Sequence, residues 1–515
     1  MAQCLHLRVF IRKKKNKSGS YSFHIVRKEG RKQVLVKALG SARDIAEIRK
    51  LESSALRELS QIVKQTEFDF TYDQDEQFLS QLSENIQSIR IVGPELILGK
   101  LFDEVGFNQI KEKLFRQLVL ARICYPGSKL RTVEYLLRHH QEFYDIDAVY
   151  RYLDKLNRKH KEQLQTISYK HTIQLFGGVM SVVFYDVTTL YFEASDEDDL
   201  RKMGFSKDGK SQQPQIVLGL LVSTGGYPLA FEMFEGNKFE GQTMLPVIEK
   251  FKIKFGLKDI IIVADAGLLS NENIAALTKL NYQFILGARI KNEAKTIQKN
   301  ILSQTFKNGQ TQIIPKADKM SLIISYSQAR AANDKNNRER GLHRLEKLIK
   351  KGKLTKQHIN NRGYNKYLQL DGDVTININY QKFKEDAKWD GLKGYLTNTT
   401  LSANEVIDNY KQLWQIEKAF RISKTDLKVR PIYHRLKHRI ETHLIIAFCS
   451  YKIYKELERQ LQLKQTGISP EKAIAIMQSI FAVQTTLPIS DKSIELIMAK
   501  TEEQQTLLSH FEIKF

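Results

Sequence analysis

Cysteine, long apolar runs and a leader segment are scarce or missing in this 515-residue chain. Its three cysteines lie far apart, which excludes a disulfide framework and a zinc ribbon and favours a reducing compartment. No run of about eighteen apolar residues occurs, which excludes a membrane-spanning helix. Residues 5–11 are apolar but include His6 and Arg8, unlike the core of a signal peptide. We therefore expect a cytoplasmic protein with no membrane partner.

Basic residues clearly outnumber acidic ones. The chain has 81 Lys and Arg against 58 Asp and Glu, a net charge of +23, and a pI near 9.5. A protein this basic usually binds a polyanion, and the lack of membrane features favours nucleic acid. A solvated basic surface without a partner is the alternative. At about 150 residues per domain, the length predicts two to four domains.

The first 66 residues predict a basic β-hairpin followed by a helix. Apolar and polar residues alternate from 21 to 25, and residues 33–39 can pair with them across Glu29-Gly30. We expect a charged tip in this region to bind DNA phosphates, although lysines at a strand edge can also serve only to keep that edge soluble. The tip includes Lys13, Lys14 and Lys15.

Three other regions flank the centre of the chain. Residues 67–95 are polar and acidic, which predicts a linker. Residues 96–178 show apolar side chains at helical spacing with several arginines, which predicts a helical DNA-binding region. Residues 461–515 have a helical pattern. The run at 126–129 (PGSK) lacks the Gly-x4-Gly-Lys frame of a phosphate loop and follows a helix, so we reject that interpretation.

The centre of the chain has an α/β pattern. Apolar and β-branched runs predict strands in the order βββαβαβ at 181–191, 215–223, 227–234, 259–264 and 283–287. Three meandering strands and a crossover to a parallel strand predict a mixed sheet, with helices available to cover its faces. This first part of the core, residues 179–289, is followed by an insertion at 290–398 that mixes strand-like runs with a basic helix.

Two aspartates occupy unusual places in these strands. Asp186 lies inside an otherwise apolar strand, and Asp265 ends another. If the first strand neighbours the fourth, the two carboxylates come close together, and a divalent cation would offset their repulsion. Oxygen ligands with room for water suit Mg²⁺. For either residue alone, a hydrogen-bonded structural aspartate would be the better interpretation.

A third acid lies on a helix with a clear start signal. Ser402 and Glu405 form a capping box, and the helix can continue to about Lys428. At about 100° per residue, Tyr410, Glu417 and Lys424 share one stripe of this helix, and Glu417 is the candidate for a third metal ligand. Glu417 falls at the border between the apolar and polar faces. A solvated Glu417 paired with Arg421 four residues on is the alternative.

Four runs in these regions resemble a known family, the DDE transposases of bacterial insertion sequences, in the insertion-sequence-four group. The runs are YDVTTLYFE at 185–193, VADAGLLSNENI at 263–274, WDGLKGYLTN at 389–398 and YKQLWQIEKAFRISKTDLKVRPIYH at 410–434. The resemblance implies a ribonuclease H-like α/β fold, with a mixed sheet covered on both faces. A β-rich insertion at 290–398 would interrupt it, and residues 399–460 would complete the core.

The resemblance also implies the site. Asp186, Asp265 and Glu417 would be the catalytic and metal-binding triad. Tyr410 and Lys424 match two further positions of the family's helix signature and would contact DNA phosphates. Leu413 stands where that signature has an Arg, and the nearby Arg421 is a candidate substitute.

The implied reaction is phosphoryl transfer with two Mg²⁺ ions, which Mn²⁺ can replace. The enzyme would bind double-stranded DNA at terminal inverted repeats, cleave it, and join the freed 3′-OH to target DNA. The resemblance further implies a dimer on DNA and association with the bacterial nucleoid. Two alternatives remain open: a DNA-binding transposase remnant without catalysis, and a structure-specific nuclease of the same fold.

Overall fold

The computed structural model describes most of the chain, which forms two compact units. The smaller unit is Met1–Gln87 with Thr485–Ile494, and the larger is Ser88–Gln484 with Glu495–Phe515. The described residues are 9–63, 84–178, 180–206, 209–257, 259–360, 363–371, 375–487 and 492–513.

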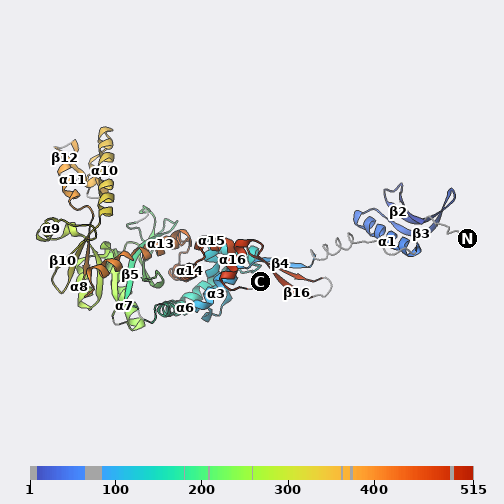
Figure 1. The fold of residues 1–515 in the computed structure, drawn as a ribbon, viewed down its shortest axis with the longest axis horizontal. Coiled ribbons are helices and arrows are strands. Elements are labelled where there is room, and N and C mark those ends of the chain that lie inside the picture. The colour runs from blue at the N-terminus through green and yellow to red at the C-terminus, as the bar shows by residue number, and fades with distance from the viewer. Residues whose placement is uncertain are drawn as a thin grey trace. The chain divides into compact units, whose positions relative to one another are not determined.

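The smaller unit contains the predicted hairpin and helix (Figure 1). Its antiparallel sheet has the order β1 (Val9–Lys15), β2 (Tyr21–Glu29) and β3 (Lys32–Ala42), and α1 (Ile45–Val63) packs on it. The pairing expected across Glu29-Gly30 is confirmed, because Glu29 lies opposite Lys32.

The predicted charged tip is placed differently. Lys13, Lys14 and Lys15 belong to strand β1, and the turn itself begins at Asn16. The strand extends this far because the pairing of β1 with β2 continues to Lys15 and Tyr21. The Lys13 ammonium lies 5.3 Å from the centre of the Phe23 ring, so its alkyl stem covers an aromatic side chain.

The predicted linker and C-terminal region also differ from expectation. The acidic residues of the linker lie outside the described residues, and its last part forms strand β4 (Ile86–Ile91). A three-stranded sheet has the order β16-β15-β4. The C-terminal region is therefore not all helical: it has β15 (Phe481–Thr486) and β16 (Ser493–Met498) beside α15 (Pro470–Met477) and α16 (Glu502–His510). β-branched residues such as Val483 favour this extended conformation.

The region expected to be helical, 96–178, is helical, and one long C-terminal helix packs against it. It comprises a π-helix, η1 (Glu95–Gly99), with α3 (Lys100–Val105), α4 (Lys113–Cys124), α5 (Lys129–His140) and α6 (Ile146–Leu175). Helix α14 (Lys437–Leu463) packs against α4 and α6 and is buried along most of its length. Even so, each helix in the described ranges is too short or too polar to cross a bilayer.

An eight-stranded mixed sheet forms the centre of the larger unit, in the order β10-β11-β14-β9-β8-β5-β6-β7. Its strands are β5 (Val182–Tyr191), β6 (Gln215–Ser223), β7 (Pro228–Glu235), β8 (Ile261–Ala264), β9 (Gln283–Ala288), β10 (Thr311–Pro315), β11 (Ser321–Tyr326) and β14 (Leu392–Thr397). Strand β8 is parallel to both β5 and β9, and the other pairs are antiparallel. The predicted meander and the predicted neighbourhood of the first and fourth strands are confirmed.

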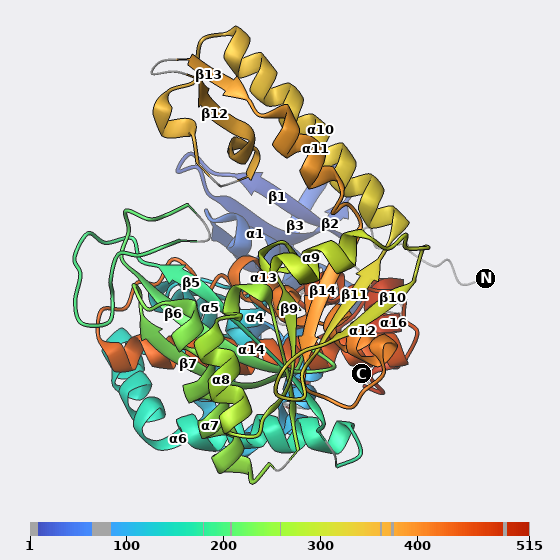
Figure 2. The same ribbon diagram turned by 90° about the vertical axis from the view of Figure 1, so that its left-hand side faces the viewer.

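Helices cover both faces of this sheet (Figure 2). On one face, α7 (Met244–Phe255) and α8 (Asn271–Lys279) share a core with Tyr185 of β5. On the other, α12 (Ala403–Lys411), α13 (Trp414–Thr425) and α14 share a core with Phe184 of β5. Because side chains alternate along a strand, Asp186 lies on the same side as Phe184, facing α12–α14.

The insertion is mixed α/β rather than β-rich. Strands β10 and β11 extend the main sheet, and α9 (Lys295–Leu302), α10 (Gln328–Lys350) and α11 (Tyr380–Ala387) are helices. Helix α10 lies beside the hairpin of β12 (Leu368–Asp371) and β13 (Thr375–Ile378) in Figures 1 and 2. A small core that includes Leu345 and Tyr367 holds these elements together, because it buries the apolar stripe of a helix that is otherwise strongly polar.

Short helical turns complete the described elements. They are η2 (Phe107–Gln109), η3 (Glu240–Gln242), η4 (Ala266–Leu268), η5 (Ile290–Asn292), η6 (Lys356–His358) and η7 (Gly363–Tyr367). Of these, η4 directly follows Asp265 and turns the chain away from the sheet.

We predict that α14 determines much of the stability of the larger unit. Leu457 of α14 is 0% exposed, whereas Leu463 at the end of the same helix is 63% exposed. Leu457→Ala should therefore lower the free energy of unfolding by about 2–5 kcal/mol, and the matched Leu463→Ala by less than about 0.5 kcal/mol. Urea titration followed by circular dichroism measures both. Equal effects would contradict the placement of α14.

Candidate active site

Strand pairing places Asp186 beside Asp265. In the parallel pair β5–β8, Tyr185 lies opposite Ala264, and the next residues are Asp186, inside β5, and Asp265, directly after the end of β8. Asp265 keeps an extended backbone, with φ −75° and ψ 162°. Neighbouring strands are about 4.8 Å apart, so the two side chains emerge side by side on the α12–α14 face. The predicted proximity of these two strand positions is therefore observed.

The helix that follows the insertion is broken, contrary to the prediction of one helix from Ser402 to Lys428. The capping box of Ser402 and Glu405 is present and starts α12. Helix α12 ends at Lys411, and α13 begins at Trp414 with Leu413 as its N-cap. Tight turns form at the junction, where the Leu413 N–H donates to the Tyr410 carbonyl. The break occurs where Leu413 is drawn into the core, 6% exposed.

Tyr410, at the end of α12, contacts one of the aspartates directly. Its hydroxyl donates to Asp265 Oδ1 at 2.9 Å. The ring is buried, 4% exposed, and packs against Tyr395 of β14. Burial, together with the charge of Asp265, raises the pKa of the Tyr410 phenol, so the hydroxyl stays protonated as a donor. Tyr410 thus orients Asp265 rather than lying free to meet phosphate.

Lys393 of β14 is a site residue that the sequence reasoning did not assign. Its Nζ lies 4.4 Å from the centre of the Tyr410 ring. Burial and the charge of Arg330 lower the pKa of Lys393, while Asp265 and Glu417 act in the opposite direction. A lysine between two such acids is available to neutralise negative charge there. The signal was a single Lys inside the apolar strand of the WDGLKGYLTN run.

Glu417 lies in the first turn of α13 and is exposed. Its electrostatic effect on both Lys393 and Tyr410 places it near the same group of side chains as Asp265. The helix N-terminus favours a carboxylate at this position. The alternative ion pair with Arg421 is not formed within the described chain, and Arg421 points to solvent as an exposed residue.

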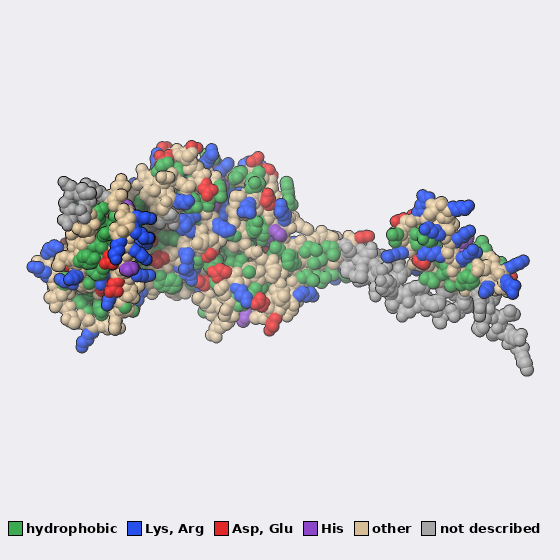
Figure 3. Space-filling model, turned by 90° about the horizontal axis from the view of Figure 1, so that it is seen from above, with side chains coloured by type: hydrophobic (Ala, Val, Ile, Leu, Met, Phe, Trp, Pro, Cys, Tyr) green, Lys and Arg blue, Asp and Glu red, His purple; other side chains and the backbone are tan. Residues whose placement is uncertain are grey.

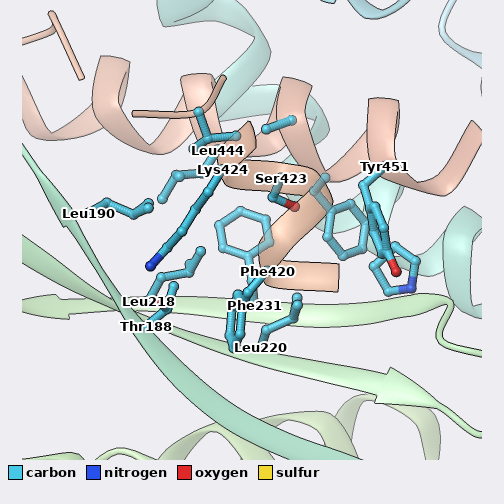
Figure 4. Close-up of a pocket in the computed structure, with 14 residues that line it drawn as sticks. Thr188, Leu190, Leu218, Leu220, Phe231, Phe420, Ser423, Lys424, Leu444 and Tyr451 are labelled. Atoms are coloured by element: carbon cyan, nitrogen blue, oxygen red, sulfur yellow. The ribbon is translucent and has the colours of Figure 1, made fainter. Parts of the chain in front are cut away.

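Lys424 lies two turns after Glu417 on α13. Its alkyl stem lines an apolar cavity of about 40 Å³ between the sheet and α13–α14. Figure 4 shows the side chain extending from the helix toward β5 and β6, beside Thr188 and Leu218. Because Thr188 follows Asp186 by two residues on the same face of β5, Lys424 reaches the strand that carries the first aspartate.

The three predicted ligands have the chemistry that a divalent cation prefers, but their side chains are not gathered into one site. The three acids provide only oxygen ligands, as Mg²⁺ prefers, and Asp265 and Glu417 are exposed to solvent that could complete the coordination. Among the described residues, no three His, Cys, Asp or Glu side chains lie close enough together to hold a metal ion. The structure therefore sets Asp186 and Asp265 side by side, with Glu417 on the facing helix, but does not gather the three into one metal site.

Other candidates are placed less centrally. Trp414 is 50% exposed because it starts α13 on the solvent side. His443 is buried and bonded through Nε2 to the Val429 carbonyl. Lys13, Lys14 and Lys15 belong to the smaller unit, with Lys13 paired to Glu52.

One comparison with known proteins identifies a family. The profile described as transposase DDE domain matches residues 177–453, more than half of the chain. One similar solved structure is a piggyBac transposase synaptic complex with hairpin DNA, with TM-score 0.36 and 9% identity over 75% of this chain and 78% of that chain. Another is the Mos1 transposase paired-end complex with left transposon end, with TM-score 0.16 and 10% identity over 33% and 57%, respectively. A search of curated proteins gave no match.

We predict that the position of the Tyr410 side chain requires a glycine at residue 287 of β9. A Cβ at Gly287 would lie 2.4 Å from the Tyr410 hydroxyl oxygen and 3.0 Å from the Ala266 nitrogen. Gly287→Ala should cost about 1–3 kcal/mol of unfolding free energy, and less in a Tyr410→Phe background, where the nearest atom is gone.

Gly219→Ala is the matched control for this cycle. Its Cβ would meet the Tyr185 hydroxyl, also at 2.4 Å, on the opposite face of the sheet. Tyr410→Phe should leave the cost of Gly219→Ala unchanged. Thermal unfolding of the five variants measures the coupling, and strictly additive costs for Gly287→Ala and Tyr410→Phe would place the Tyr410 hydroxyl elsewhere.

Proposed function

Because this chain belongs to the transposase DDE domain family, we propose that Asp186, Asp265 and Glu417 form the catalytic centre with which this transposase cuts DNA. It would cleave at the ends of an insertion sequence and join the freed 3′-OH to target DNA. The observation that carries the assignment is the parallel pairing of β5 with β8, which sets Asp186 beside Asp265 on the face covered by the Glu417 helix.

We also propose membership of the insertion-sequence-four group and a ribonuclease H-like core. The strand order β7-β6-β5-β8-β9 supports the fold, since it joins an antiparallel meander to two parallel strands through helical crossovers. Tyr410, Glu417 and Lys424 support the group because they stand at the positions of its helix signature. Leu413 departs from that signature, and its burial means that it cannot replace an Arg in contacting DNA.

The three acids would hold divalent metal, which we propose to be two Mg²⁺ ions. When bound, the metal would activate the attacking water or 3′-OH and stabilise the leaving oxygen. Tyr410 keeps Asp265 oriented through its 2.9 Å hydrogen bond. Lys393 offsets the negative charge of Asp265 and Glu417 before the metal arrives and can then bind a phosphate oxygen of the DNA.

Replacement of the acids by amides should separate catalysis from binding. Asp186→Asn, Asp265→Asn and Glu417→Gln each remove one oxygen ligand, so Mg²⁺-dependent cleavage of an element-end duplex should fall by about 10²-fold or more. Affinity for the same duplex should persist. Asp408→Asn is the matched control, since Asp408 is an exposed acid on α12 whose one ion pair among the described residues is with Lys411. Cleavage that survives in all three site variants would refute the assignment.

A strand-transfer assay separates the transposase from its two alternatives. The wild-type protein, given a precut end with a 3′-OH and a target plasmid, should yield joined products. A nuclease of the same fold would cut but not join, and a DNA-binding remnant would do neither. Because joining uses the same centre, Asp186→Asn should abolish the products, whereas Asp408→Asn should retain them.

We propose that the smaller unit grips DNA through phosphate contacts and that the protein acts as a dimer on paired ends. Figure 3 shows Lys and Arg side chains gathered on this unit. The double substitution Lys14→Gln with Lys15→Gln removes two exposed cations of β1 and should reduce the slope of log affinity against log salt by about 2.

The matched control for the salt slope lies at the other end of the same sheet. Lys28 and Lys32 are exposed beside the β2–β3 turn, and their replacement by Gln should change the slope less. Filter binding at several salt concentrations measures all three proteins. A slope that is the same for wild type and the β1 variant would exclude β1 from the DNA contact.

A further inference from the structure

A strongly basic cavity lies in the larger unit, at the end of the strand that carries Asp186. It has a volume of about 420 Å³ and is lined by α4, the start of α5, α6, α14 and the segment after α13. Its cationic lining residues are Arg122, Lys129, Arg131, Lys428 and Arg430, and no Asp or Glu is among the described residues that line it.

Two of these cations are almost completely buried without a counter-charge. Lys129 and Arg122 are each 3% exposed. Within the described chain, the Lys129 ammonium makes no hydrogen bond or ion pair, and Arg122 makes only a 3.5 Å bond to the Leu427 carbonyl. Burial lowers the pKa of both, that of Arg122 to about 10, and in Lys129 the charge of Arg122 adds to the effect. Burying these two cations destabilises the fold, and no counter-charge in the described chain offsets that destabilisation.

Other buried cations of the larger unit are satisfied. Lys452 is 0% exposed, and its ammonium donates to the Ser168 carbonyl at 3.0 Å and to the Thr172 hydroxyl. Arg201 is 6% exposed and pairs with Asp198 at 2.7 Å. Within the described chain, Lys129 therefore differs from these residues in having no partner and Arg122 in having only one long hydrogen bond, although all four are buried.

The start of α5 adds donors to the same place. Ser128 caps this twelve-residue helix, and its first residue is Lys129. The positive end of the helix dipole thus coincides with the buried ammonium. The carboxylate of Asp154, which acts on the lining residue His434, is already bonded to Arg439 at 2.8 Å and 3.0 Å.

We propose that this cavity is a built phosphate site that takes a backbone phosphate of the DNA, with Lys129 and Arg122 as its ligands. The proposal rests on the proposed function, because it supplies an anchor for the strand being cut. The cavity is adjacent to the end of β5, where Phe192 bridges to Ile432 and Arg430 lies over Tyr191. Six residues of extended strand separate Asp186 from Phe192, about 20 Å, which a few nucleotides would span.

Lys129→Met tests the site in the full-length protein. Removal of a buried, unpaired charge should leave the unfolding temperature unchanged or raise it, while affinity for an element-end duplex should fall about ten- to hundredfold. Arg122→Met should behave in the same way. The matched control is Arg138→Gln, a basic residue in the last turn of α5 that does not line the cavity. Near-wild-type affinity in Lys129→Met, or loss of stability in both Met variants, would overturn the proposal.

An experiment with inorganic phosphate distinguishes a site for a DNA backbone phosphate from a site for free phosphate. At constant ionic strength, phosphate in place of chloride should raise the unfolding temperature of the wild type but not of Lys129→Met, and should compete with DNA. A rise that depends on Lys129 with no change in DNA affinity would mean that the cavity takes free phosphate, and would refute a backbone contact. The phosphate experiment needs no DNA cleavage, so its outcome is independent of the catalytic assignment. It can be repeated in Asp186→Asn as a check.

Discussion

The parallel pairing of β5 with β8 is the constraint on which the candidate site depends. It fixes two carboxylates one strand apart, and like charges at that separation repel each other. The surrounding elements reduce this cost: Tyr410 donates to Asp265, and Lys393 brings a positive charge to Asp265 and Glu417. The remaining repulsion is what a divalent cation would relieve. A site of this kind is arranged for a ligand rather than for the stability of the empty fold.

The two faces of the main sheet have different roles. The α7–α8 face is closed by apolar packing, with Tyr185 among its fully buried side chains. The other face carries both aspartates, and its helices α12 and α13 are joined by a break at Leu413. Because of this break, the Tyr410 side chain contacts Asp265 while Glu417 stays exposed to solvent. In one continuous helix, two residues seven positions apart would lie on the same stripe and would have similar surroundings.

Local patterns predicted much of this arrangement, and tertiary packing decided the rest. The β-branched runs and the acid that ends one of them predicted β5, β8 and their adjacency, and the capping box predicted the start of α12. The break at Leu413 could not be foreseen, because helical periodicity continues through it and only the core draws Leu413 inward. Lys393 is non-local too: its role depends on residues from β8 and α13 that meet it only in the fold. Strands β15 and β16 were missed because strands of six residues are too short to give a clear periodic signal.

Two clusters of like charge, opposite in sign, lie along β5. Asp186 and Asp265 gather negative charge near its middle, and Lys129 and Arg122 gather positive charge in the cavity beside its end. Each cluster alone is unfavourable, and the two are too far apart to neutralise each other directly, since charges beyond a Debye length of about 8 Å are screened where solvent reaches them. A DNA strand with metal bound at one phosphate presents the complementary charges in the same order. One DNA strand with its metal would therefore offset the repulsion in both clusters. Binding of a phosphate at Lys129 and Arg122 would then favour binding of the metal-bound phosphate at Asp186 and Asp265.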